Sequence, residues 1–178
     1  QEVIVQVEKE ERGNKGAALT TYLSLAGRYC VLMPNSAKGG GVSRKITNVA
    51  DRKRLKSVVG SLDVPQGMAV IVRTAGSKRT KTEIKRDFSY LSKLWNEIRE
   101  KTLSSEAPSL IHEEGSLVKR AIRDIYTNNV EEVLVEGEAS YKMAREQMKM
   151  LIPSHAKRVI KYTDNEHLFQ RHRVEEQL

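Results

Sequence analysis

The chain turns at residues 65–67 and continues as MAVIVRTAG over residues 68–76. The Pro-Gln-Gly triplet is typical of a turn, and the apolar run behind it predicts a short buried strand over residues 68–72. Arg73 and Thr74 follow at the end of that strand. A guanidinium can bind two phosphate oxygens at once and an adjacent hydroxyl adds a third donor, so the pattern is typical of a phosphate site. An arginine that merely caps the strand end is the alternative, and the spacing alone favours it.

Positive charge is concentrated around this strand. Residues 28–86 hold 14 Lys and Arg and three acids, a balance of +11, so a chain with a formal charge of +8 carries −3 elsewhere. Such a surplus is expected of a protein that binds a polyanion, and nucleic acid is the leading candidate. A solvated basic surface is the alternative, and the absence of a basic amphipathic helix disfavours a membrane surface. Arg44, Lys45 and the glycines before them share this segment, which favours a ligand for Arg73.

Composition limits the class of protein. The 178 residues leave room for one domain or two small ones, and 39% hydrophobic with 30% charged residues is typical of a folded globular chain. No apolar run approaches the roughly 20 residues of a membrane span. The single cysteine, Cys30, excludes an internal disulfide and favours a reducing compartment. The first residues, QEVIVQVEKEERG, lack the basic-then-apolar layout of a secretory signal. The sequence begins and stops inside regular patterns, so it is interpreted as part of a larger protein.

Periodicity and turn residues predict a β-rich first half that ends in a long helix. The helix begins at a capping box formed by Thr80 and Glu83. Its apolar positions follow at steps of 4, 3, 4 and 3 residues, and its aromatic members are interpreted as core rather than as base-stacking groups. The predicted elements are a half-buried strand at 3–7, a hairpin of 17–25 and 29–33, a loop at 34–41, a helix at 51–62, and the long helix with Ile84, Phe88, Leu91, Trp95 and Ile98 inward.

The second half alternates between strand and helix, which favours an α/β layer with a partly parallel sheet. Its predicted elements are a strand at 109–112, a helix at 117–126, a strand at 133–135, a helix at 140–151 and a strand at 159–162. No catalytic or metal-binding constellation is evident in either half. The four histidines lack metal-ligand spacing, Cys30 is interpreted as a packed thiol, and Gly13-Asn14-Lys15-Gly16 is interpreted as a turn.

Several long motifs point to one family. They are EERGNKGAALTTYLSLAGRYCVLMPNS (10–36), GGGVSRKI (39–46), PQGMAVIVRTAG (65–76), LWNEIRE around Trp95, APSLIHEEGSLVKRAIRD (107–124), EEVLVEG and HLFQRHRVEEQL. Together they resemble the bacterial ribonuclease E/G family over essentially the whole chain. The second half is most similar to the alphaproteobacterial ribonuclease E branch of that family.

The resemblance implies a fold and a domain order. The fold class is α+β, with a small β-rich sensor subdomain that contains the long helix, followed by an RNase H-like α/β subdomain. Residues 1–21 resemble the end of an OB-fold RNA-binding domain. Residues 22–118 resemble a sensor for the 5′ end of RNA, and residues 119–178 resemble part of the RNase H-like subdomain, which is structural in this family.

The resemblance also implies a set of RNA-binding residues. In the family, the arginine and threonine of the VRTAG motif bind the terminal phosphate, and these positions are Arg73 and Thr74 here. Backbone groups of the AG-x-Y-x-V segment, at Gly27 and Val31, assist them, as does the arginine of the GG-x-S-R motif, at Arg44. Lys15 matches a basic residue near the RNA path, with lower specificity. Cys30 departs from the leucine that the family often has there.

By the same resemblance the chain is an RNA-binding part of a single-strand-specific endoribonuclease of RNA processing and decay, and it senses the 5′-monophosphate. No catalytic residue and no metal ligand is assigned here, so the chain alone is predicted to be inactive; magnesium and zinc belong to the whole family protein. The expected partners are 5′-monophosphorylated single-stranded RNA and, through the whole protein, a homotetramer, degradosome proteins and the inner face of the cytoplasmic membrane. The alternative is a general RNA-backbone-binding or tetramer-assembly module without 5′-end selectivity.

Overall fold

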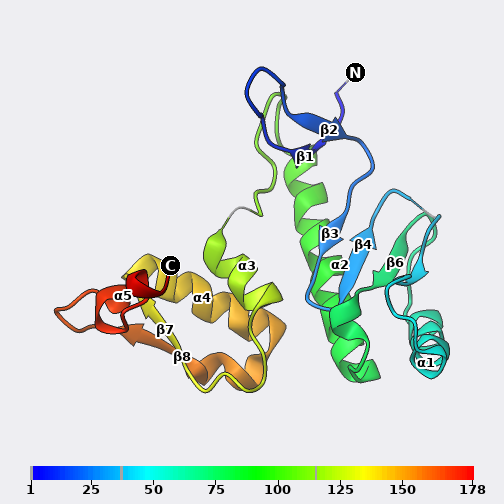
Figure 1. Ribbon diagram of the computed structural model, residues 1–178. Helices are drawn as coiled ribbons and strands as arrows, with labels where there is room; N and C mark the ends of the chain where they lie inside the picture. Colours follow the sequence, from blue (N-terminus) through cyan, green and yellow to red (C-terminus); the bar gives the residue numbers. More distant parts are fainter. Residues whose placement is uncertain (1, 37, 115) are drawn as a thin grey trace. The chain divides into compact units, whose positions relative to one another are not determined.

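Two units divide the chain, Gln1–His112 and Glu113–Leu178. The computed structural model describes residues 2–36, 38–114 and 116–178. Both units combine small sheets with helices (Figure 1), so the α+β class expected from the sequence is confirmed. The domain names that the resemblance implies for residues 1–21, 22–118 and 119–178 stay predictions.

A four-stranded mixed sheet lies at the centre of the first unit. Its order is β3 (Leu25–Ala26), β4 (Cys30–Met33), β6 (Ala69–Val72) and β5 (Gly41–Val42). β4 pairs antiparallel with both β3 and β6, whereas β5 runs parallel to β6. Three of the four residues of β6 are buried, as expected for an apolar strand inside a sheet. The strand predicted at residues 68–72 is confirmed.

Two helices pack against this sheet. Helix α1 (Val49–Gly60) contacts β5 and β6, and α2 (Lys81–Leu103) contacts β3 and β4. The predicted capping box starts α2: the Thr80 hydroxyl accepts from the Glu83 amide at 3.2 Å, and the Glu83 carboxylate accepts from the Thr80 amide at 2.8 Å. Both predicted helices are therefore confirmed. The predicted loop at residues 34–41 contains Ala37, which lies outside the described residues, and its last residue begins β5.

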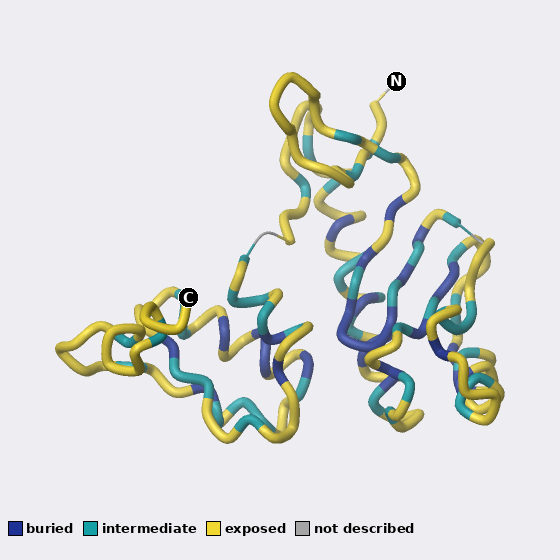
Figure 2. Tube along the Cα trace, viewed as in Figure 1, coloured by how far each residue is buried: buried dark blue, intermediate teal, exposed yellow. Residues whose placement is uncertain are grey.

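The buried residues of the first unit gather between the sheet and the helices (Figure 2). Leu32, Leu55, Ile84 and Leu91 have no exposed surface. Phe88 belongs to the same cluster and Trp95 packs against it. The interpretation of these two aromatic residues as part of the core is thus confirmed, with Phe88 buried and Trp95 partly buried.

The first strand was predicted at residues 3–7, but residues 2–5 have no regular secondary structure, and the face predicted to be inward is exposed. β1 (Gln6–Lys9) pairs antiparallel with β2 (Ala18–Thr20), and the valines that were predicted to be half-buried, Val3, Val5 and Val7, are 69%, 44% and 55% exposed. Ile4 packs against the core instead. The side chain of Gln6 accepts from the Ser24 N–H at 2.8 Å and donates to the Ser24 carbonyl at 3.0 Å. An alternating pattern predicts a strand, but which face is inward depends on the partner.

The predicted hairpin strand at residues 17–25 is two strands in two sheets. Its first part is β2, and its last residue begins β3, which pairs with β4. Between them the side chain of Asn35 accepts from the Leu23 amide at 3.0 Å and donates to the Thr21 carbonyl at 2.6 Å. This side chain, 12 to 14 positions away, holds the bend, and no local pattern could have located it.

The second unit has a parallel strand pair beside a helix. β7 (Val133–Glu136) pairs in parallel with β8 (Val159–Tyr162), and α4 (Glu138–Leu151) packs against both strands and against α3 (Leu117–Asp124). The remaining elements are η2 (Pro153–Arg158), α5 (Leu168–Arg171) and η3 (Glu175–Gln177). The helices and strands predicted between residues 117 and 162 are confirmed, as is the parallel pairing.

The strand predicted at residues 109–112 is wrong. These residues have no regular secondary structure, and Leu110 is 68% exposed. A short apolar run forms a strand only when a neighbouring strand satisfies its backbone groups.

None of the helices in the described parts of the chain is long and apolar enough to cross a membrane.

Candidate nucleic-acid interface

Three loops meet at one end of the four-stranded sheet. β4 begins and β6 ends there, because Cys30 pairs with Val72 in an antiparallel register. β5 ends there too, since it runs parallel to β6 with Val42 beside Val72. The Ser43 amide continues this pairing by donating to the Val72 carbonyl at 2.9 Å. The topology therefore places the loops after β3, β5 and β6 side by side.

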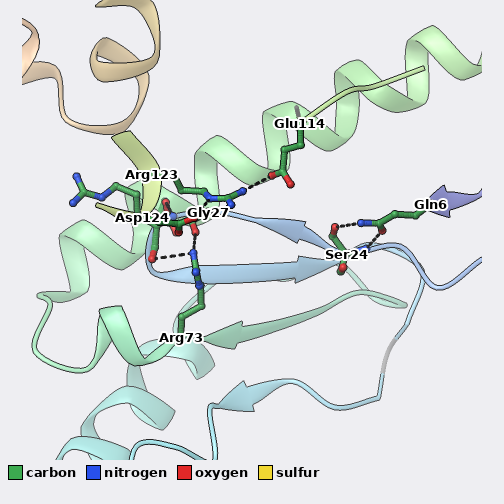
Figure 3. A network of polar contacts seen from close by, with 9 residues as sticks. Gln6, Ser24, Gly27, Arg73, Glu114, Arg123 and Asp124 are labelled. Atoms are coloured by element: carbon green, nitrogen blue, oxygen red, sulfur yellow. Dashed lines mark hydrogen bonds and ion pairs between the residues drawn. The ribbon is translucent and has the colours of Figure 1, made fainter. Parts of the chain in front are cut away.

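Arg73 leaves the end of β6 and is held by the loop between β3 and β4 (Figure 3). Its amide donates to the Tyr29 carbonyl at 2.7 Å. Its Nη1 donates to the Gly27 carbonyl and, at 3.5 Å, to the Arg28 carbonyl. The side chain is only partly buried. These two carbonyl oxygens are neutral acceptors, and the contacts orient the guanidinium.

A buried carboxylate holds the same loop from α2. Asp87 is 5% exposed and accepts from three consecutive amides, those of Arg28, Tyr29 and Cys30, at 3.0, 2.8 and 2.8 Å. Burial raises the pKa of Asp87 above its ordinary value, whereas the three amides and the Arg28 charge act in the opposite direction. The carboxylate thus provides acceptors for a run of amides that would otherwise be buried without partners.

Two glycines make this close packing possible. A Cβ at Gly27 would lie 2.8 Å from both Cγ and Oδ1 of Asp87. A Cβ at Gly76 would lie 2.8 Å from Cγ1 of Val72 and 3.0 Å from the Tyr29 carbonyl oxygen. The 2.8 Å separations are shorter than real Cβ contacts, so a side chain at either position would push the loops apart.

Cationic side chains surround the loop. Arg28 is buried with its guanidinium carbon 5.3 Å from the centroid of the Tyr29 ring, and the guanidinium carbon of Arg79 lies 5.4 Å from the same centroid. Both separations suit a cation–π interaction. Burial would raise the pKa of Glu83, but hydrogen bonds from Thr80 and the charges of Arg79 and Arg28 outweigh it, and the pKa is lowered.

Helix α1 fixes the other two loops with two arginines. Arg52 donates from Nη1 to two carbonyls of residues 43–46, both at 2.8 Å. Arg54 donates to the carbonyls of Ser77 and Arg79, the latter at 2.8 Å. The loops that follow β5 and β6 are thereby tied to the same helix.

Most of the predicted site residues lie at this end of the sheet. Arg73 contacts Gly27 directly, and Thr74 follows in the short helix η1 (Thr74–Gly76) with its side chain exposed. Arg44 is exposed in the loop after β5. Val31 lies in β4, opposite Ile71 of β6. For Gly27, the amide donates within its own loop, to the Cys30 carbonyl at 2.8 Å.

Lys15 lies away from the others. It is exposed in the turn between β1 and β2, where its main chain pairs with that of Arg12. The hairpin is tied through Gln6 to Ser24, which precedes β3, whereas Gly27 follows β3 (Figure 3). Lys15 therefore does not join the cluster around Arg73.

Asp87 is the residue of the site that the sequence analysis missed. It lies three positions after Ile84 and four before Leu91, on the stripe that packs inward, where an ionised side chain is costly unless it is bonded. An acid within an apolar helical stripe was the available signal.

The parts of the chain that the structure describes contain no group of three or more His, Cys, Asp or Glu side chains that could hold a metal ion.

The known proteins that are similar to this chain point to one family. The model of the Ribonuclease E/G family matches residues 24–178. The chain is 45% identical to ribonuclease E of Haemophilus influenzae over 178 residues, which are 100% of this chain and 19% of that protein. It is 43% identical to ribonuclease E of Escherichia coli strain K12 over 179 residues, 100% of this chain and 17% of that protein.

A ribonuclease G is also similar. The chain is 31% identical to ribonuclease G of Haemophilus influenzae over 175 residues, 98% of this chain and 35% of that protein. The chain spans about a fifth of the length of the two ribonuclease E relatives and about a third of the length of the ribonuclease G relative. The similarity to the alphaproteobacterial branch stays a prediction.

Proposed function

The chain belongs to the ribonuclease E/G family, and we propose that it is an RNA-binding part of an endoribonuclease of RNA processing and decay, in which Arg73 and its neighbours bind the 5′-monophosphate of single-stranded RNA. The observation that carries the proposal is the placement of Arg73. Its guanidinium is oriented by main-chain carbonyls at the end of the sheet that also carries Thr74 and Arg44.

Charge and donor geometry give the selectivity. A terminal monophosphate carries about −1.5 to −2 charges near neutral pH, more than an internal phosphodiester, and a 5′-hydroxyl carries none. We propose that Arg73 supplies the guanidinium, that the exposed Thr74 hydroxyl donates beside it, and that Arg44 adds charge from the neighbouring loop. Gly27 and Val31 belong to the proposed set through the loop and strand that hold Arg73, because the Gly27 N–H and carbonyl already bond to Cys30 and Arg73. Lys15 contacts RNA further along its path.

The rest of the function is proposed for the whole protein. Held by its 5′ end, the RNA would have a raised local concentration at a cleavage site elsewhere in the molecule. The described residues contain no group of three or more His, Cys, Asp or Glu side chains that could hold magnesium or zinc, and we propose that these ions, which the resemblance implies, belong to other parts of the whole protein. We propose that this chain alone does not cleave RNA, and that tetramer assembly, degradosome proteins, and a cytoplasmic location at the membrane belong to the whole protein.

Fluorescence anisotropy with a short single-stranded RNA tests the proposal. The 178-residue chain is expected to bind the 5′-monophosphate form more tightly than the 5′-hydroxyl form. Arg73→Ala should weaken binding of the monophosphate form by about 10- to 150-fold, the value of one charged hydrogen-bonded contact, and leave the hydroxyl form nearly unchanged.

Arg99→Ala is the matched control, because it removes the same charge from an exposed position far along α2. It should change both affinities only slightly. Equal losses for the two RNAs in Arg73→Ala would contradict the assignment of the phosphate site.

A second candidate function is general binding of the RNA backbone. Exposed lysines on α1, Lys53 and Lys56, lie on the helix that holds the loop with Arg44 and Lys45, and they support it. Such binding would fall steeply with salt and show no preference for either 5′ end. Repeating the titration at two salt concentrations separates this candidate from the first.

A further inference from the structure

We propose that Asp87 is a positioning residue for Arg73 and acts through the three peptide groups between Gly27 and Cys30. The inference rests on the proposed function and names the residue outside the phosphate site on which its geometry depends. Asp87 is on α2 and Arg73 follows β6, and the loop between β3 and β4 joins them.

Each of the three peptide groups bonds to both residues. The first peptide group joins Gly27 to Arg28. Its N–H, of Arg28, donates to Asp87, and its carbonyl, of Gly27, accepts from Nη1 of Arg73. In the second, the Tyr29 N–H donates to Asp87 at 2.8 Å and the Arg28 carbonyl accepts from Nη1 at 3.5 Å. In the third, the Cys30 N–H donates to Asp87 at 2.8 Å and the Tyr29 carbonyl accepts from the Arg73 amide at 2.7 Å.

Peptide geometry makes this coupling obligatory. In a planar trans peptide the N–H and the C=O point in opposite directions. Three N–H groups that converge on one carboxylate therefore turn three carbonyls away from it, and Arg73 lies where these carbonyls point. Hydrogen bonds in such chains also polarise one another, so an ionised acceptor at one end strengthens the bonds at the other.

The site is built to keep the carboxylate in place. Asp87 is almost completely buried, and the absence of a side chain at Gly27 leaves the room that it occupies. Asp87 and the phosphate that Arg73 would bind are both anions. Through space, the Asp87 charge repels the phosphate and weakens its binding, whereas through the loop Asp87 orients Arg73 and strengthens that binding. The two effects have opposite signs, so a variant can separate them.

Asp87→Asn separates the two effects. If Asp87 acted only by its charge, its removal would take away a repulsion and tighten binding of the 5′-monophosphate. If it positions Arg73, the amide that replaces it cannot accept all three N–H groups, the carbonyls lose their orientation, and the preference for 5′-monophosphate over 5′-hydroxyl RNA should fall about 10-fold. An unchanged or increased preference would overturn the proposal.

Two comparisons exclude a merely structural role. In an Arg73→Ala background, Asp87→Asn should cause no further loss of preference, because the residue through which it acts is gone. Glu97→Gln, which removes a charge from an exposed position of the same helix, and Ile98→Val, which loosens the core beneath it, should keep the preference. A loss of equal size in both backgrounds would overturn the proposal.

A measurement without RNA distinguishes this inference from the proposed function. In the 178-residue chain labelled with ¹⁵N-arginine, the Arg73 Nε–H signal should differ from those of exposed arginines and move toward them in Asp87→Asn. Gly27→Ala, which would displace the carboxylate, should give the same change and serves if Asp87→Asn does not fold. A wild-type chain without end preference would refute the proposed function, whereas an Arg73 signal unmoved in either variant would refute the positioning role.

Discussion

Burial at the start of β4 suppresses the chemistry of the chain's single thiol. Cys30 has no exposed surface, and burial together with the Asp87 charge raises its pKa well above the ordinary value, with the Arg73 charge acting in the opposite direction. The thiolate is the reactive form, so the native chain should react with iodoacetamide about 100-fold more slowly than the urea-unfolded chain. Mass spectrometry of the alkylated protein measures both rates, and equal rates would contradict this packing.

Single residues were predictable from the sequence where their role depends on local order. Arg73 and Thr74 follow a buried strand, so their position at a sheet end could be inferred. Asp87 could not be assigned in the same way, because its partners lie 57 to 59 positions earlier in the chain. The valines of residues 3–7 illustrate the other limit, since alternation alone tells neither where a strand begins nor which of its faces is inward.

At the scale of the element, the capping box makes α2 sensitive to pH. The pKa of Glu83 is lowered in the folded chain, so the stability that its carboxylate contributes is present above its ordinary pKa and is lost as the pH falls through the lowered value. Glu83→Gln removes the charge while Thr80 still caps the helix, so it should reduce the free energy of unfolding by roughly 0.5 kcal/mol near neutral pH, the size of a charge interaction at a helix start, and by less in acid.

Urea titrations followed by circular dichroism at several pH values measure this difference. Glu97→Gln is the control, because its side chain is exposed on the same helix and should leave the pH dependence unchanged. A Glu83→Gln variant whose stability loss is the same in acid as at neutral pH would contradict the prediction.

The helices were predicted better than the first strands for a physical reason. A helix satisfies its backbone within one segment, so its cap and its apolar stripe are both local, as in α1 and α2. The strands β2 and β3 depend on partners in two different sheets, and the bend between them depends on Asn35. The apolar run at residues 109–112 has no such partner and forms no strand.

At the scale of the whole molecule, the phosphate site belongs to one unit. Arg73, Thr74, Arg44, Asp87 and Gly27 all lie within the unit Gln1–His112. A chain that ends at residue 112 is therefore expected to fold and to keep the preference for 5′-monophosphate RNA within about twofold. Circular dichroism checks the fold and anisotropy checks the preference. A folded truncated chain without preference would show that the second unit contributes to the site.

The link between Asp87 and Arg73 is made of backbone, and this has a consequence for how the family can diverge. Arg28, Tyr29 and Cys30 bond to Asp87 through peptide N–H groups, which every residue except proline provides. A side chain that fits the same buried position can therefore replace one of theirs without removing the hydrogen bond, whereas a change of the acid on α2 removes all three. Homologues would then vary more at residues 28–30, beside the arginine, than at a carboxylate nearly 60 positions away, so that sequence variability at the loop would be a poor measure of its importance.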